Sequence, residues 1–152
     1  MRTDDQRAAA LGQVLELALL VNDDMTRSLG RDGLTPSRAH LLWELHGRGP
    51  STQSVLAEAL GVSPRNVTGL VDGLVATGFV TREPHPTDRR ATLVSFTDRG
   101  ARTAAEFESG QFEFASVLFD GMPDRRFDGL AQGLADVLVR LRAATATAEA
   151  RS

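Results

Sequence analysis

The stretch that decides the fold, residues 51–100, reads STQSVLAEALGVSPRNVTGLVDGLVATGFVTREPHPTDRRATLVSFTDRG. Its apolar side chains first recur at one-face helical spacing, which predicts a short helix with Ser51 as its N-cap. Gly61 ends this helix, because glycine readily takes the left-handed conformation that turns a chain sharply. Ser63 then offers a cap, and Pro64 suits the first position of a second helix. The short turn between them predicts a helix-turn-helix.

The second helix is predicted to have one buried and one exposed face. Its apolar stripe has ordinary helical spacing and consists of Val67, Leu70, Val71, Leu74 and Val75. The opposite face includes Gly69 and Gly73, each costing about 1 kcal/mol relative to alanine, so something must come close or the helix packs tightly. Because the start of such a helix enters the major groove, the candidate DNA-reading residues are Ser63, Arg65, Asn66, Thr68 and Gly69. The alternative is a solvated face on a structural helix.

A two-stranded hairpin follows the second helix. Residues 79–82 and 92–96 have strand character, and the polar segment between them contains two prolines. The arginines are expected to project past the strands, where they suit phosphate contacts or a narrow minor groove. We also expect the Asp88 carboxylate to orient the Arg90 guanidinium by a paired hydrogen bond. The candidate wing residues are Arg82, Asp88, Arg89 and Arg90. Alone, such a tip is more often a solvated loop.

In this order, the elements resemble the MarR-type winged helix-turn-helix repressors. The resemblance rests on four motifs: Gly61-Val62-Ser63, Gly78-Phe79-Val80-Thr81-Arg82, Asp88-Arg89-Arg90 and Thr97-Asp98-Arg99-Gly100. It is close from Thr35 to Gly100, with Phe96 where the family usually has leucine. The resemblance implies a homodimer, a palindromic operator, and often a small-molecule inducer bound between the DNA-binding and dimerisation regions.

The expected fold is mainly α with a small β-wing, of class α+β. Residues 31–100 form the winged helix-turn-helix DNA-binding region, and residues 1–30 and 101–152 form a helical dimerisation region. Apolar residues keep helical spacing from Thr3 to Leu29, and so long a helix at the start of the chain cannot bury itself. It needs the C-terminal helices, from both subunits.

His40 and Trp43 are the candidate residues for a pocket that takes a small aromatic or lipophilic effector. Trp43 is the only tryptophan, and ligand pockets are mostly apolar and aromatic. Core packing is the alternative role for this side chain.

Composition narrows the classes of function. The net charge of −3 argues against a general nucleic-acid binder with a basic surface. The absence of cysteine excludes disulfides and thiolate metal ligands, and the three histidines lack the close spacing of a zinc site. No cofactor motif or catalytic constellation is present, so we expect neither an enzyme nor a bound metal. Without an apolar run of membrane-spanning length or a signal-peptide layout, a soluble cytoplasmic protein is expected.

The sequence thus predicts a sequence-specific, DNA-binding transcriptional regulator without cofactors. In its full form the prediction is a homodimeric repressor of a palindromic operator, relieved by a small lipophilic or aromatic ligand. Two alternatives stay open: a winged-helix protein of another regulator family, and a winged-helix dimer that acts through protein partners instead of DNA.

Overall fold

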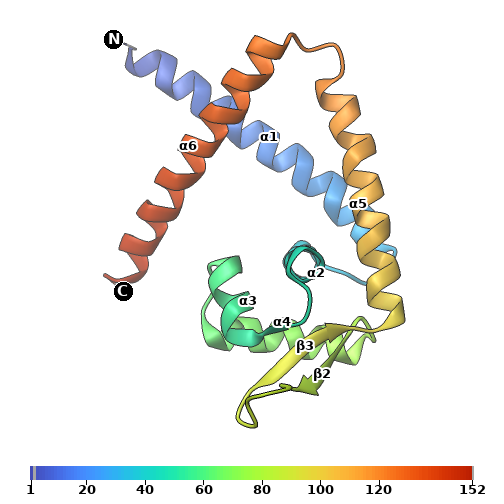
Figure 1. Ribbon diagram of the computed structural model, residues 1–152. Coiled ribbons are helices and arrows are strands. Elements are labelled where there is room, and N and C mark those ends of the chain that lie inside the picture. Colours follow the sequence, from blue (N-terminus) through green and yellow to red (C-terminus); the bar gives the residue numbers. More distant parts are fainter. Residues whose placement is uncertain (2, 152) are drawn as a thin grey trace. The chain divides into compact units, whose positions relative to one another are not determined.

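The computed structural model describes residue 1 and residues 3–151, and this part of the chain is mostly helical, with one small antiparallel sheet (Figure 1). This confirms the predicted fold class. In chain order the elements are α1 (Asp4–Gly30), α2 (Pro36–Arg48), β1 (Ser51–Thr52), α3 (Gln53–Leu60), α4 (Pro64–Ala76), β2 (Val80–Pro84), β3 (Thr92–Phe96), α5 (Asp98–Phe119) and α6 (Asp124–Glu149). The chain divides into two compact units, Met1–Phe107 and Glu108–Ser152, and α5 runs from one into the other.

Local capping chemistry sets where the first four helices begin. In each, a serine or threonine hydroxyl accepts a hydrogen bond from a free backbone amide of the first turn, and the caps are Thr3, Thr35, Thr52 and Ser63. The expectation of an N-cap at Ser51 is therefore wrong by one residue. Gly61 ends α3 in the left-handed conformation, with φ of 65° and ψ of 36°, as predicted.

The wing has a third strand that the sequence did not reveal. The strand order is β1-β3-β2, with Ser51 opposite Val94 and Arg82 opposite the same residue on the other side. Ser51 is buried, and its hydroxyl donates to the Gly49 carbonyl at 2.9 Å. Strand β1 thus attaches the base of the wing directly to the residues that start α3.

The core of the first unit lies between helices α2, α3 and α4 and the base of the wing. Its fully buried large side chains are Leu41, Leu42, Leu45, Leu56, Val67, Val71, Leu74, Phe79, Val80 and Val94. Val75, expected in the apolar stripe of α4, is instead 38% exposed, and Val55 on α3 is 42% exposed. Three other residues of the α4 stripe, Val67, Val71 and Leu74, are buried as expected. The exposed face of α4 is consequently fixed by the burial of its other face.

The long helices leave much of their apolar surface open to solvent. Helix α1 buries only Leu29, and none of the described residues of α6 is buried. The exposed apolar side chains include Leu11, Leu15, Leu19, Leu20, Phe112, Val117, Leu138, Val139 and Leu141. Within the second unit, the rings of Phe119 and Phe127 meet edge to face at 5.4 Å. Within the described residues, no helix combines the length and apolar character that a bilayer span requires.

Candidate nucleic-acid interface

The start of α4 is fixed by its cap and its first helical residue. The Ser63 hydroxyl accepts from the Asn66 amide at 3.1 Å, and Pro64 follows at the first helical position. On the inner face, Val67 and Val71 are at most 1% exposed. The side chains on the outer face are therefore presented in a defined rotation, and the five predicted DNA-reading residues, Ser63, Arg65, Asn66, Thr68 and Gly69, are all exposed.

These residues differ in how free their side chains are. Among the described residues, none pairs with the guanidinium of Arg65 or the amide group of Asn66. Thr68, in contrast, donates its hydroxyl proton to the Pro64 carbonyl at 2.9 Å and accepts from Gln53 Nε2 at 3.0 Å. The side chains of Arg65 and Asn66 are thus available to hydrogen-bond with a partner, whereas the Thr68 hydroxyl already forms two hydrogen bonds within the protein.

The two glycines of α4 have different surroundings. A Cβ atom at Gly73 would collide with the guanidinium of Arg38, whose Cζ would lie 2.6 Å away, so this glycine makes room for a side chain of α2. A Cβ atom at Gly69 would have no neighbour within 4 Å. The Arg38 guanidinium thus occupies the space beside Gly73, whereas no described residue fills the space beside Gly69.

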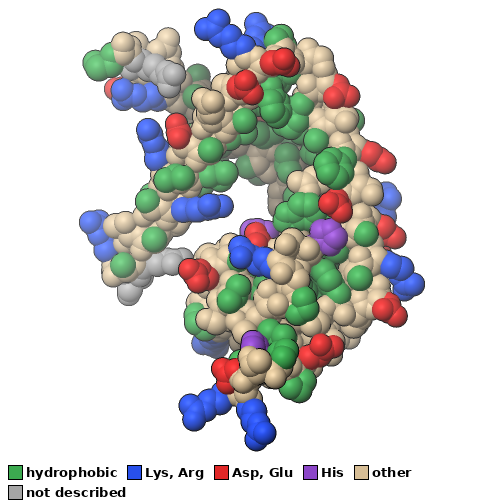
Figure 2. Space-filling model, viewed as in Figure 1, with side chains coloured by type: hydrophobic (Ala, Val, Ile, Leu, Met, Phe, Trp, Pro, Cys, Tyr) green, Lys and Arg blue, Asp and Glu red, His purple; other side chains and the backbone are tan. Residues whose placement is uncertain are grey.

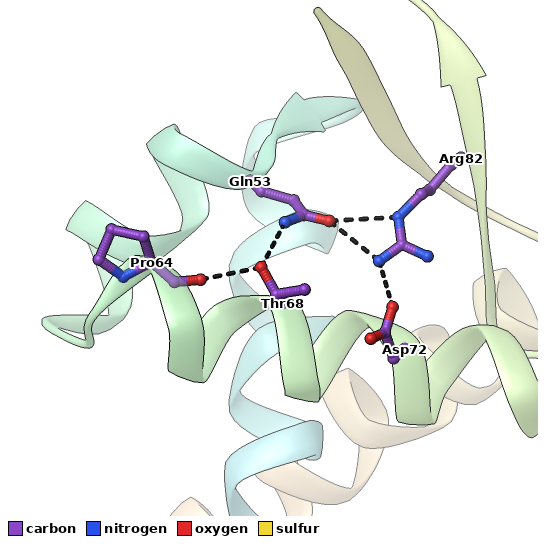
Figure 3. A network of polar contacts seen from close by, with 5 residues as sticks. All are labelled: Gln53, Pro64, Thr68, Asp72 and Arg82. Carbon is purple, nitrogen blue, oxygen red and sulfur yellow. Dashed lines mark hydrogen bonds and ion pairs between the residues drawn. The ribbon is translucent and has the colours of Figure 1, made fainter.

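Arg82 does not project from the wing, and that expectation is wrong. Its guanidinium lies against the two helices of the helix-turn-helix (Figure 3), donating to Gln53 Oε1 through Nε at 3.2 Å and Nη2 at 3.1 Å. The same Nη2 forms an ion pair with Asp72 at 2.5 Å. Since Gln53 also donates to Thr68, one polar network joins β2, α3 and α4. Arg82 therefore links the base of the wing to the recognition helix.

The wing tip carries the two freely exposed arginines of the hairpin. Arg89 and Arg90 are exposed, and no described side chain pairs with either guanidinium. Figure 2 shows basic side chains extending at this tip. The expected pairing of the Asp88 carboxylate with the Arg90 guanidinium is wrong: in the described structure, Asp88 Oδ1 accepts from the Arg90 backbone amide at 3.0 Å. Asp88 thus shapes the turn, and the Arg90 guanidinium remains available.

The residues after β3 anchor the wing to the core. Thr97 donates its hydroxyl proton to the Gly78 carbonyl at 2.6 Å, and its backbone amide donates to the Phe79 carbonyl at 3.1 Å. The Arg99 guanidinium lies 4.2 Å from the centre of the Phe79 ring, a cation-π contact. A side chain at Gly100 would overlap the Phe79 carbonyl oxygen. The motif Thr97-Asp98-Arg99-Gly100 therefore fixes where the wing leaves the core.

Two residues of the interface were not singled out from the sequence, namely Gln53 and His85. Gln53 bridges Arg82 and Thr68, and His85 Nδ1 accepts from the backbone amides of Thr87 at 3.2 Å and Asp88 at 3.1 Å. The Gln53 contacts join residues distant in the sequence, so no local pattern indicates them. The His85 contacts are local and could have been read as a side-chain acceptor followed by free amides two and three residues later.

Of the two candidate pocket residues, His40 lines a cavity that Trp43 does not line. His40 lines an open cavity of about 70 Å³, together with Ser37, Leu60, Val62, Asn66 and Leu70. Trp43 is 36% exposed, and its ring lies 6.0 Å from that of His46. Among the described residues, no three histidine, cysteine or acidic side chains gather as metal ligands would.

The sequence profile of the MarR family matches residues 32–91, which contain α2 and most of the winged helix. A curated relative, the HTH-type transcriptional repressor YetL of Bacillus subtilis, is 33% identical over 86 residues, or 57% of this chain. This chain spans about half of that relative, 52% of its length.

Two solved structures share the fold. AbsC, a MarR family transcriptional regulator from Streptomyces coelicolor, is 23% identical with a TM-score of 0.78, over 94% of this chain and 98% of its own. A Staphylococcus aureus MepR-DNA complex is 20% identical with a TM-score of 0.73, over 85% and 95%. YetL is named a transcriptional repressor and AbsC a transcriptional regulator. By profile, relative and fold, the chain is similar to the MarR family of winged-helix transcriptional regulators.

Proposed function

We propose that this chain is a sequence-specific DNA-binding transcriptional regulator whose helix α4 enters the major groove. The observation that carries the proposal is the exposed polar start of α4, with Arg65 and Asn66 free on a helix locked by its buried face. Arginine offers paired donors to guanine or phosphate, and asparagine pairs with adenine. MepR was solved bound to DNA and has the same fold, which supports this use of the helix.

The wing tip is proposed to add contacts to the DNA backbone or the minor groove. Arg89 and Arg90 sit on a short loop between β2 and β3, with no competing acidic partner among the described side chains. Arginine at such a site suits phosphate oxygens or a narrow, strongly negative minor groove. Arg82 takes a different role in this proposal: it holds the wing against α3 and α4 through Gln53 and Asp72.

The chain is proposed to act as a homodimer through α1, the C-terminal part of α5, and α6. Side chains such as Leu19 on α1 and Phe112 and Val117 on α5 are 68%, 69% and 79% exposed, and large apolar side chains left exposed along a helix are typical of an interface. A two-fold symmetric dimer reads a palindromic operator, with half-sites about 34 Å apart, one turn of DNA. Sedimentation equilibrium of the full chain tests this part, and a monomer at micromolar concentration would contradict it.

Repression relieved by a small lipophilic or aromatic ligand is the finer form of the proposal. Support for repression comes from the relative YetL, which is named a repressor. The cavity at His40 is about 70 Å³, far below the several hundred Å³ of a typical small-molecule pocket, so it cannot enclose such a ligand alone. A ligand must favour one spacing of the two recognition helices to act at all. If no aromatic acid or lipophilic compound changes DNA affinity, the ligand part is abandoned.

The test is fluorescence anisotropy of labelled DNA from upstream of the gene, titrated with protein across a salt series. Arg90→Ala is compared with Arg48→Ala, which removes an equal charge from an arginine paired with Glu44 at 3.0 Å on α2. We expect tight, steeply salt-dependent wild-type binding, with a slope lower by about 1 in Arg90→Ala only. If wild type binds neither this DNA nor any sequence recovered from a random pool, the chain instead acts through protein partners.

A further inference from the structure

The wing tip is held together by a histidine ring that accepts hydrogen bonds. His85 Nδ1 receives the backbone N–H of Thr87 at 3.2 Å and of Asp88 at 3.1 Å, and the Thr87 hydroxyl lies 3.3 Å from the same nitrogen. A backbone amide can only donate, so Nδ1 must present its lone pair. The ring is therefore neutral in this arrangement, with its proton on Nε2.

This acceptor belongs to a set of contacts that closes the whole tip. The His85 backbone amide donates to the Ala91 carbonyl at 3.1 Å, and the Ala91 amide donates to the Asp88 carbonyl at 3.2 Å. Asp88 Oδ1 in turn accepts from the Arg90 amide at 3.0 Å. The backbone on both sides of Arg89 is thus tied down, and the His85 ring supplies the acceptor for the first half of the loop.

We propose that His85 is a positioning residue for DNA binding, and that its neutral ring presents Arg90 to the DNA while its protonated ring releases the tip. The proposal rests on the proposed function above. Histidine is the side chain that ordinarily gains a proton between about pH 5 and 8. An imidazolium carries N–H on both nitrogens, so the amides of Thr87 and Asp88 would face a donor and lose their acceptor.

Other charged side chains lie on the same loop as the His85 ring and on the strand that leads into it. The tip itself contributes Asp88, Arg89 and Arg90, and the adjoining strand β2 contributes Glu83, whose carboxylate accepts from Ser95 at 3.4 Å. Strand β3, Thr92–Phe96, has no titratable side chain. Protonation also adds a positive charge near DNA, which by itself favours binding. A simple comparison of affinities at two pH values would mix the two effects.

The loss of DNA affinity caused by Arg90→Ala, measured at each pH, separates release of the tip from the effect of the added charge. The added charge is present with or without the Arg90 side chain. DNA affinity is measured at pH 8.0 and pH 5.5 for the wild type, His85→Asn and His85→Ala, each with and without Arg90→Ala. Asparagine keeps an acceptor for the amides two and three residues later and does not titrate. In the wild type, Arg90→Ala is expected to weaken binding about tenfold at pH 8.0 and less than about threefold at pH 5.5, since one good contact contributes roughly that much.

In the His85→Asn background, Arg90→Ala should weaken DNA binding about tenfold at both pH values, because the asparagine keeps the tip in place. In the His85→Ala background, it should weaken binding less than about threefold at both. The proposal is wrong if the loss of affinity caused by Arg90→Ala changes with pH equally in the wild type and in His85→Asn. It is also wrong if Arg90→Ala still weakens binding about tenfold in His85→Ala, because the ring would then not position Arg90.

A second measurement, on the DNA-free chain, separates a failure of DNA binding from a failure of the His85 contacts. In amide NMR spectra, the Thr87 and Asp88 signals should shift with the same midpoint as the His85 ring, and that midpoint should vanish in His85→Asn. If these signals titrate as expected but no DNA binds, the proposed function fails and the DNA role of His85 with it. If DNA binds and these amides do not follow the ring, the positioning role alone is overturned.

Discussion

Replacing Gly69 by alanine tests whether helix α4 keeps a glycine for the sake of a partner outside the chain. Alanine is favoured over glycine by about 1 kcal/mol in a helix interior. The added Cβ would have no neighbour within 4 Å, so nothing in the structure offsets this gain. We therefore expect Gly69→Ala to raise the free energy of unfolding by about 1 kcal/mol, or roughly 2–4 °C in Tm for a chain of this size.

DNA binding should move in the opposite direction. Gly69 lies on the exposed face of α4 with Arg65, and an added methyl group against a closely approaching base pair costs about 1–3 kcal/mol, as in other overpacked contacts. We expect the affinity of Gly69→Ala for its DNA to fall about tenfold, which corresponds to about 1.4 kcal/mol.

The assay pairs urea unfolding with anisotropy titration, at one fixed protein concentration because the stability of a dimer depends on it. Gly47→Ala is the matched control: it is an exposed glycine of α2, and its Cβ would also have no neighbour within 4 Å. The control should gain stability and keep its DNA affinity. If Gly69→Ala is more stable and binds DNA as tightly as the wild type, no close approach explains this glycine.

Three further substitutions test the supports of the interface. In Gly100→Ala, the new Cβ would overlap the Phe79 carbonyl oxygen, so urea unfolding should show a loss of about 3 kcal/mol. Ser63→Ala removes the N-cap of α4 and should cost about 1 kcal/mol in the same assay while weakening DNA binding. Arg82→Ala should weaken DNA binding without lowering the salt slope in anisotropy, because its charge is already paired with Asp72; a slope lower by about 1 would show that Arg82 contacts phosphate in the complex.

The helix starts could be predicted where their signals lie within a few residues. The predicted start of α4, with Ser63 as N-cap and Pro64 as the first helical residue, is correct because a cap and a following proline act locally. Ser51 was misread as a cap, because a two-residue strand has no alternation to detect and its partner Val94 lies far along the chain. Ser51 pairs with β3 in the sheet, and the next residue with a hydroxyl, Thr52, is the N-cap of α3.

Side-chain directions in the wing were predicted less well, since they depend on contacts between elements. The run VTREP gives no indication that Arg82 meets Gln53 from α3 and Asp72 from α4. The Asp88 error has a different origin. A carboxylate two residues before an arginine can reach either its backbone amide or its guanidinium, and the amide is closer in a tight turn.

The pairing of charges explains why a net charge of −3 is compatible with an interface for DNA. Exposed charges act over about 10 Å at ordinary salt, so the charges that matter are those at the contact and not the total. Within the winged helix, Asp72 is occupied by Arg82, and the Asp88 carboxylate faces a backbone amide. These two acidic side chains therefore stabilise the structure of the candidate interface. Arg65, Arg89 and Arg90 keep their charge for an anionic partner, which is the distribution that a phosphate backbone requires.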